Sequence, residues 1–262
     1  ISGLFLAGQI NGTTGYEEAA GQGIIAGFNA ALQTQDQEPF ILTRDEAYIG
    51  VLIDDLVRLG TNEPYRMFTS RAEYRLRLRA DNADQRLMPK AIEIGAVSRE
   101  TIATFQSKLL KIQELESAMH RLNITPNAAE KHGLKINKDG KRRSAFDLIK
   151  YKEISYQDVA EIWPELRDYP SDIIEQIEIH AKYSDYITLQ ERDIKVFKKD
   201  ENIKIPTGFD FNAIGSLSSE VKEKLNKINP ENLGQASRIS GVTPAAILAI
   251  LVEIKKLNKK VS

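Results

Sequence analysis

The sequence has no cysteine and only 3 histidines among its 262 residues, and these shortages limit the chemistry it can carry. Without cysteine there are no disulfides, thiolate metal ligands or thiol nucleophiles within these residues, which fits a reducing compartment. No apolar run approaches the roughly 20 residues of a membrane-spanning helix, and no signal peptide precedes the first elements. We therefore expect a cytoplasmic protein without membrane contact or a metal site.

The sequence also lacks an excess of charge of either sign. Its formal net charge is -1, so nucleic-acid binding is favoured only where cations cluster locally. Hydrophobic residues make up 42% and charged residues 28%, which is typical of a folded globular protein. The length allows one large domain or two to three small ones.

A short apolar segment, Gly3 to Gly8, predicts a buried strand at the start of the chain. A strand that is apolar on both faces needs sheet neighbours, and the next forty residues supply none. We therefore expect the chain to be a fragment whose first strand belongs to a sheet built by upstream residues. The predicted fold class is mainly α, with a terminal strand and helix as the remnant of an α/β domain and a helical region after them.

The rest of the chain shows mostly helical periodicity. A capping box at Thr43 and Glu46 predicts a helix that stops at Gly60, and Ser98 predicts a cap for a long helix to Leu122. Further helices are expected over 16–32, 81–88, 89–95, 171–199, 218–228, 231–238 and 244–260. Residues 203–211 are predicted to be a linker with a hinge at Pro206 and Gly208.

A glycine-rich turn, residues 9–15, separates the first strand from a helix with Glu17 and Glu18 in its first turn. The exposed N–H groups of such a helix terminus favour a phosphate or the negative charge of a reduced flavin. The alternative is that Gly12 and Gly15 only provide the backbone freedom of a tight turn. The spacing alone leaves both interpretations open.

A basic segment lies between Arg66 and Lys90, with seven cations against three acids. Strict alternation over 74–79 predicts a strand that carries Arg75, Arg77 and Arg79 on one face. Such a row can follow a phosphate backbone, or it can be a solvated face paired with nearby acids. The pattern alone does not separate these alternatives.

Three dense motifs resemble the GidA/MnmG family, and the resemblance covers essentially the whole chain. They are Gly3 to Ala20 (GLFLAGQINGTTGYEEAA), Glu63 to Asp84 and Asn232 to Ile247 (NLGQASRISGVTPAAI). In related flavoproteins the first strand and helix close the FAD site. The resemblance therefore implies FAD contacts at Gly8, Gln9, Asn11, Gly12 and Thr13.

The second motif implies tRNA binding, which the resemblance assigns to Arg66, Arg71, Arg75 and Arg79. Arg77 lies where the family pattern is open, and no role is assigned to it. The third motif implies docking of a GTPase partner, MnmE, which we place at Arg238 and Gly241. His180 departs from the family's more usual Gln or Glu, and no chemistry is assigned to it or to His120 and His132.

For the complete protein, the resemblance implies addition of an aminomethyl or carboxymethylaminomethyl group to the wobble uridine of tRNA. FAD, NADH as reductant, a folate-derived one-carbon donor and a homodimer are implied with it. The expected regions are an FAD-domain remnant (1–97), a helical middle (98–203) and a small helical module (204–262). Because the family's catalytic cysteines must lie upstream, we expect no catalytic residue here and a fragment that is inactive alone. The alternatives are a flavin disulfide-reductase relative and a non-enzymatic RNA-binding adaptor.

Overall fold

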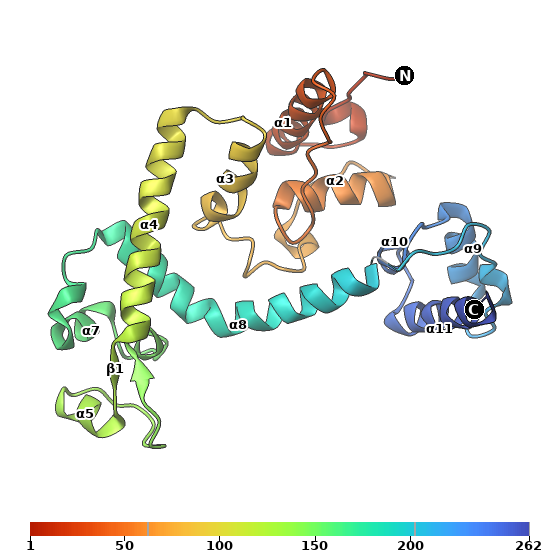
Figure 1. Cartoon of the computed structure of the whole chain (residues 1–262). Coiled ribbons are helices and arrows are strands. Elements are labelled where there is room, and N and C mark those ends of the chain that lie inside the picture. Colours follow the sequence, from red (N-terminus) through yellow and green to blue (C-terminus); the bar gives the residue numbers. More distant parts are fainter. Residues whose placement is uncertain (62, 202, 262) are drawn as a thin grey trace. The chain divides into compact units, whose positions relative to one another are not determined.

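The computed structural model describes residues 1–61, 63–201 and 203–261. The described chain is mainly helical, as the sequence predicts (Figure 1). It divides into two compact units, the first made of residues 1–73 and 190–262 and the second of residues 74–189. No helix within the described ranges has both the length and the apolar character that a bilayer crossing requires.

The first unit contains helices from both ends of the chain. They are the 3-10 helices η1 (Gly8–Asn11), η2 (Thr69–Arg71) and η4 (Phe211–Ala213), and the α-helices α1 (Tyr16–Gln33), α2 (Tyr48–Leu59), α9 (Ser219–Ile228), α10 (Leu233–Ser237) and α11 (Pro244–Val261). The predicted helices over 16–32, 218–228, 231–238 and 244–260 are therefore confirmed.

Residues 3–7 form no paired strand among the described residues, and Leu4, Phe5 and Leu6 are 55%, 40% and 51% exposed. The predicted strand has no neighbour in the described residues, so it stays a prediction. A second prediction for the start of this unit is wrong. The capping box at Thr43 does not start α2. Glu46 accepts a hydrogen bond from the Thr43 backbone N–H (2.9 Å), but residues 44–46 form a separate turn and α2 begins after Ala47.

The second unit is built around the long helix α4. Its elements are α3 (Ala83–Glu93), α4 (Arg99–Arg121), β1 (Asn123–Ile124), α5 (Pro126–Lys131), β2 (Arg143–Ser144), α6 (Ala145–Leu148), α7 (Tyr156–Ile162) and η3 (Pro164–Leu166). The helix α8 (Ser171–Glu201) begins in this unit and ends in the first. β1 and β2 pair antiparallel, with Asn123 opposite Ser144.

Local capping explains where the helices of this unit begin. The Ser98 hydroxyl accepts a hydrogen bond from the Thr101 backbone N–H (3.1 Å), which confirms the predicted start of α4. The expectation of two helices meeting at Pro89 is wrong, because a single helix runs from Ala83 to Glu93 with Pro89 inside it. Pro89 has no N–H, so it removes only one hydrogen bond from this short helix.

Each unit has an apolar core of its own. In the second unit, the apolar stripe of α4 buries Leu115 and Met119 in a cluster that includes Phe146, Leu148 and Ile177. In the first unit, α9, α10 and α11 enclose a cluster of Leu225, Leu233, Ile250 and neighbouring apolar side chains.

The predicted linker, residues 203–211, contributes side chains to the apolar cluster of the first unit. It lacks helix before η4, as expected, but Ile205 and Phe211 are buried in the cluster. The Ile205 N–H also donates to the Glu231 carbonyl (2.9 Å). This segment is therefore packed against the C-terminal helices and is not a free linker.

Candidate functional site

The glycine-rich turn folds into a compact structure between residue 8 and the start of α1. Gly12 follows the last residue of η1, has φ 82° and donates its N–H to the Gln9 carbonyl (2.9 Å). This left-handed conformation favours glycine, and a Cβ at Gly12 would also press into the side chain of Thr61. Gly12 thus has a structural reason to be glycine, which supports the turn interpretation.

Gln22 lies about one and a half helical turns into α1, and its side chain fixes the glycine-rich turn by hydrogen bonds. Its Oε1 accepts hydrogen bonds from the Gly8 backbone N–H (3.1 Å) and from Asn11 Nδ2 (2.7 Å). Its Nε2 donates to Thr13 Oγ1 (3.0 Å) and to the Glu18 carbonyl (3.1 Å). Because Gln22 and Thr13 are buried, these bonds form without competition from water, and they fix the conformation of the turn.

The start of the second motif packs directly on the same turn. The Tyr65 N–H donates to the Gly12 carbonyl (2.8 Å), and the Tyr65 carbonyl accepts from the Thr14 N–H (2.9 Å). Two residues further, the Met67 N–H donates to the Glu18 carboxylate (2.8 Å). The two motifs, about fifty residues apart in sequence, therefore form one site.

The carboxylate of Glu18 lies at the N-terminus of α1. The Met67 N–H lowers the pKa of Glu18 below its ordinary value, although burial opposes that shift. The carboxylate also lies so close to Gly15 that a Cβ there would overlap it. The positive end of the α1 dipole consequently has an internal anion, so any ligand of this turn is held mainly through the turn itself.

The five predicted FAD contacts lie together on the turn, but their side chains differ in orientation. Gln9 is exposed, whereas Asn11 is engaged by Gln22 and by the Leu6 carbonyl (2.9 Å), and Thr13 is buried. The residues fit a cofactor that contacts Gln9 and the backbone of the turn, with Asn11 and Thr13 holding that backbone in place. No described group of His, Asp or Glu side chains has the arrangement of a metal site.

A partly buried ionic cluster around Arg44 contacts the Tyr65 hydroxyl through Asp55. Arg44 contacts Asp54 (3.2 Å), Asp55 (2.5 Å) and Glu73 (2.8 Å). Burial lowers the pKa of Arg44, but the hydrogen bonds that its guanidinium donates to Glu73 and Asp55 outweigh burial and raise that pKa above its ordinary value. The Tyr65 hydroxyl donates to Asp55 (2.8 Å), and burial together with this carboxylate raises the pKa of Tyr65. The cluster thereby connects α2 with the second motif.

The predicted tRNA-binding arginines of the first unit lie near this cluster. Arg71 is exposed, and its guanidinium lies over the Tyr65 ring at 4.5 Å from the centroid. Its Nε also donates to the Arg66 carbonyl (3.1 Å). Arg66 is exposed, and no carboxylate in the described residues forms an ion pair with it. Arg66 is therefore available to an external anion.

The predicted strand over 74–79 is wrong. These residues form turns, because the N–H groups of Arg77 and Leu78 both donate to the Tyr74 carbonyl (2.9 and 3.0 Å). Arg79 does not project from a strand face, since it pairs with Asp81 (3.0 Å) and donates to the Leu76 carbonyl (2.6 Å). In the described part of the chain no strand lies beside this alternating segment, and its backbone forms local turn bonds instead.

Arg75 and Arg77 differ from Arg79 within these turns. Arg75 is exposed and has no carboxylate partner among the described residues, whereas Arg77 is half-buried and accepts a hydrogen bond at its carbonyl from Asn82 (3.1 Å). Arg66 and Arg71 belong to the first unit, and Arg75 and Arg79 to the second. Of the four predicted tRNA contacts, Arg66 and Arg75 are the two most open to a ligand.

Arg238, predicted to dock the partner, is turned inward. Its side chain is only 16% exposed and contacts Asp54 at 3.2 Å, next to Arg44 and Arg58. Burial lowers the pKa of Arg238, and the Asp54 charge opposes that effect. Arg238 thus joins the corner after α10 to α2 within the first unit. Gly241 has φ 91°, a left-handed conformation that favours glycine.

Two of the three histidines, His120 and His180, share the Glu116 carboxylate and the Phe146 ring as neighbours. His180 Nδ1 lies 3.4 Å from the Glu116 carboxylate and its ring contacts Phe146, which His120 also contacts. His132 is exposed after α5. His180 therefore has a packing role against Phe146 and Glu116, and we assign it no chemistry.

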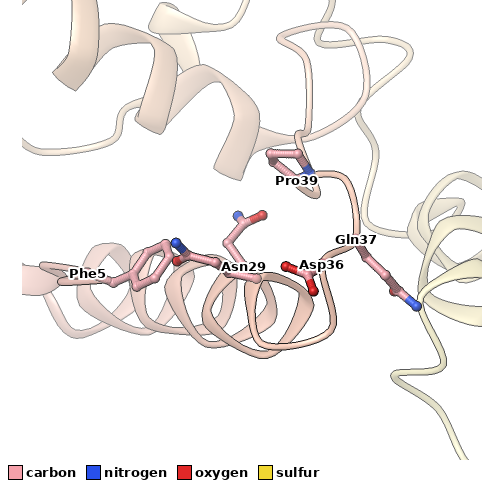
Figure 2. Close-up of a pocket in the computed structure, with 6 residues that line it drawn as sticks. Phe5, Asn29, Asp36, Gln37 and Pro39 are labelled. Atoms are coloured by element: carbon pink, nitrogen blue, oxygen red, sulfur yellow. The ribbon is translucent and has the colours of Figure 1, made fainter. Parts of the chain in front are cut away.

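A pocket of about 390 Å³ lies at the end of α1. In Figure 2 Asn29 lies between Phe5 and Asp36, with Pro39 across from them. The Asn29 amide is engaged by the Phe40 backbone, accepting from its N–H (2.7 Å) and donating to its carbonyl (3.0 Å). None of the predicted site residues lines this pocket, and we assign it no role.

Sequence reasoning missed the residues that hold the site together, namely Gln22, Asp55, Tyr65 and Arg44. Most of their partners lie outside the same helical turn, as in the bond between Tyr65 and Gly12. The only available signal was that polar residues interrupt apolar positions of α1 and α2, since Gln22 and Asp55 are both buried.

Comparison with known proteins identifies the chain. Three family models match separate parts of it: "Glucose inhibited division protein A" over 1–38, "tRNA modifying enzyme MnmG/GidA C-terminal helical domain" over 99–191, and "tRNA modifying enzyme MnmG/GidA C-terminal helical bundle" over 193–262. A glycine-rich turn followed by a mainly helical region defines the class of protein. The chain belongs to the GidA/MnmG family.

Individual relatives agree over nearly the whole chain. The tRNA uridine 5-carboxymethylaminomethyl modification enzymes MnmG of Caldicellulosiruptor saccharolyticus and Lacticaseibacillus paracasei are 48% and 49% identical over 99% of this chain. The structure of Aquifex aeolicus GidA is similar with a TM-score of 0.75 at 42% identity, over 97% of this chain and 40% of that one. The chain spans 42% of the length of the two MnmG relatives.

Proposed function

We propose that this chain is the C-terminal part of an FAD-dependent enzyme that installs (carboxymethyl)aminomethyl groups at C5 of the tRNA wobble uridine. The observation that carries this proposal is the 48% identity to an enzyme of that name over 99% of the chain. The contact between the first and second motifs supports it, because both motifs pack on the glycine-rich turn, which Gln22 fixes in one conformation. The chain itself contributes binding surfaces and no catalytic residue.

The glycine-rich turn is the proposed contact with FAD. Gln9 and the backbone of residues 8–13 would hold the cofactor, while Gln22 and Tyr65 keep that backbone in one conformation. When bound, FAD supplies the redox chemistry of the modification, with NADH as the proposed reductant. Because Asn11 and Thr13 bond internally, their contribution to the cofactor is to position the turn.

The exposed arginines of the second motif are the proposed contacts with tRNA. Arg66 and Arg75 would contact phosphates directly, because both are exposed and neither has an ion pair among the described residues. Arg71 and Arg79 would contribute mainly by holding their segments, through the Tyr65 ring and through Asp81. Phosphate contacts of this kind contribute affinity and position without reading sequence.

The module 204–262 is the proposed docking region for a GTPase of the MnmE type. The corner at Arg238 and Gly241 joins α10 to α11, and Arg238 anchors it to Asp54. We propose that Arg238 acts by holding this corner in the shape that the partner binds. A homodimer and a cytoplasmic location complete the proposal, on the family resemblance.

Binding of tRNA to Arg66→Ala and Arg75→Ala variants tests this proposal. Each substitution should weaken the binding of cognate and non-cognate tRNA alike, and it should reduce the slope of log affinity against log salt by about one unit. Arg99→Ala is the matched control, because Arg99 is also exposed and lies outside the motifs. Unchanged binding in both variants, with folding intact, would show that these arginines form only a solvated surface.

A further inference from the structure

A second concentration of positive charge lies in the second unit, in residues 131–143, which we call the basic loop. It runs from the end of α5 into β2, near the end of α4 that leads into β1 (Figure 1). Six cations and a single acid, Asp139, occur in it: Lys131, Lys135, Lys138, Lys141, Arg142 and Arg143. In a chain whose net charge is -1, this excess is local.

The backbone of the basic loop is anchored to the core of the second unit. Leu134 is buried and Ile136 packs against the same cluster. At the far end, β2 pairs with β1, and Arg142 Nη2 donates to the Asn123 carbonyl (3.1 Å). The loop is therefore held at both ends, and its cations are presented from an anchored backbone.

The apolar anchors direct the lysines outward. Lys135 lies between Leu134 and Ile136 in sequence and is exposed, as are Lys131 and Lys141. In the described residues none of these three lysines has a carboxylate partner. Two other cations do have partners: Lys138 pairs with Glu130 (2.8 Å) and Arg143 with Asp139 (2.7 Å).

The helix α4 shows what a simply solvated charged surface looks like in this unit. Its exposed charged side chains alternate between positive and negative, as at Arg99 and Glu100 or at Lys111 and Glu114. Such mixing relieves repulsion between like charges, and the basic loop lacks it. An anchored loop with repelling cations gains free energy when a polyanion covers it and releases counterions.

We propose that the basic loop is a second RNA-binding surface, which contacts the phosphate backbone of the tRNA. This proposal rests on the proposed function, and it adds a site in the second unit that is separate from the arginines of the second motif. Lysines supply point charges without the planar geometry that reads bases, so the loop adds affinity and not sequence specificity.

The experiment compares two variants of the protein that carry the same change in charge. The loop variant is Lys131→Gln, Lys135→Gln and Lys141→Gln. The control variant is Lys111→Gln, Lys152→Gln and Lys182→Gln, three exposed lysines elsewhere in the second unit. Fluorescence anisotropy with labelled tRNA, at several salt concentrations, measures affinity and its salt dependence, and circular dichroism checks folding.

The loop variant should lower the salt slope by about two units, at 0.7 to 0.9 unit per lost contact, while the control variant leaves it unchanged. Equal slopes in the two variants, with the unaltered protein binding tRNA, would overturn the basic-loop proposal and leave the proposed function standing. No salt-dependent binding by the unaltered protein would contradict both. Normal tRNA binding by the loop variant together with lost GTPase binding would instead assign the loop to a protein partner.

Discussion

Replacing Gln22 by leucine should loosen the glycine-rich turn while leaving the size of the buried side chain nearly unchanged. The substitution removes the acceptor of the Gly8 N–H and of the Asn11 amide, and it removes the donor to Thr13. Asn11 is half-buried and keeps its bond to the Leu6 carbonyl, so it is partly compensated. Gly8 and Thr13 are buried and have no such replacement in water.

The expected cost follows from those two buried groups. A buried polar group without a partner costs about 1–3 kcal/mol, and the apolar leucine recovers part of the sum, so the net cost is about 2–4 kcal/mol. Because the turn lies outside both apolar core clusters, the cost should appear as local opening rather than global unfolding. At about 1.4 kcal/mol per tenfold change, amide exchange in the turn should accelerate roughly 30- to 700-fold.

Hydrogen–deuterium exchange of peptides covering residues 7–15 measures this opening directly. Gln33→Leu is the control, because Gln33 lies on the same helix with an exposed side chain. Exchange in the turn should be unchanged in the control and fast in Gln22→Leu. An acceleration of less than about threefold in Gln22→Leu would refute the reasoning, because at 1.4 kcal/mol per tenfold it corresponds to under about 0.7 kcal/mol.

Three further predictions address other parts of the chain. The Met67 N–H lowers the pKa of Glu18 in the folded state below its ordinary value of 4.5. The ionised Glu18 carboxylate therefore stabilises the fold above pH 4.5, and this contribution is lost as pH falls through the pKa of the folded state. The thermal unfolding temperature of Glu18→Gln should depend less on pH in this acidic range than that of the unaltered protein. Gly241→Val should cost about 1–3 kcal/mol in urea unfolding because of the positive φ, whereas Gly215→Val, without positive φ and with open space around it, should cost less. Arg238→Ala should weaken GTPase binding in pull-downs without changing flavin content, and full partner binding after deletion of residues 231–262 would contradict that assignment.

Local signals predicted the helices well. Ser98 caps α4, Thr243 accepts a hydrogen bond from the Ala246 N–H (3.3 Å) at the start of α11, and Gly60 follows the last residue of α2. These features depend on residues within one helical turn of each other, so the sequence contains them directly. Two capping boxes of the same kind, at Ser144 and Ser155, were present in the sequence and were overlooked.

Tertiary context decided the elements that the sequence misassigned. The alternating residues 74–79 became turns because no partner strand lies beside them in the described chain, and Pro89 stayed inside α3. The motif residues of the candidate site were found by resemblance, but their inward or outward orientation was not. Arg238 illustrates this, because its contact with Asp54 spans 184 residues of sequence.

Nucleoside analysis of tRNA from a chimeric enzyme tests the central claim most directly. In this chimera, the present chain replaces the matching 42% of the Lacticaseibacillus paracasei MnmG, to which it is 49% identical. The chimera is expressed in a bacterial strain that lacks its own enzyme of this family, and mass spectrometry measures the wobble uridine. The account predicts that the (carboxymethyl)aminomethyl group at C5 is restored. A folded, flavin-containing chimera that leaves the uridine unmodified would contradict it.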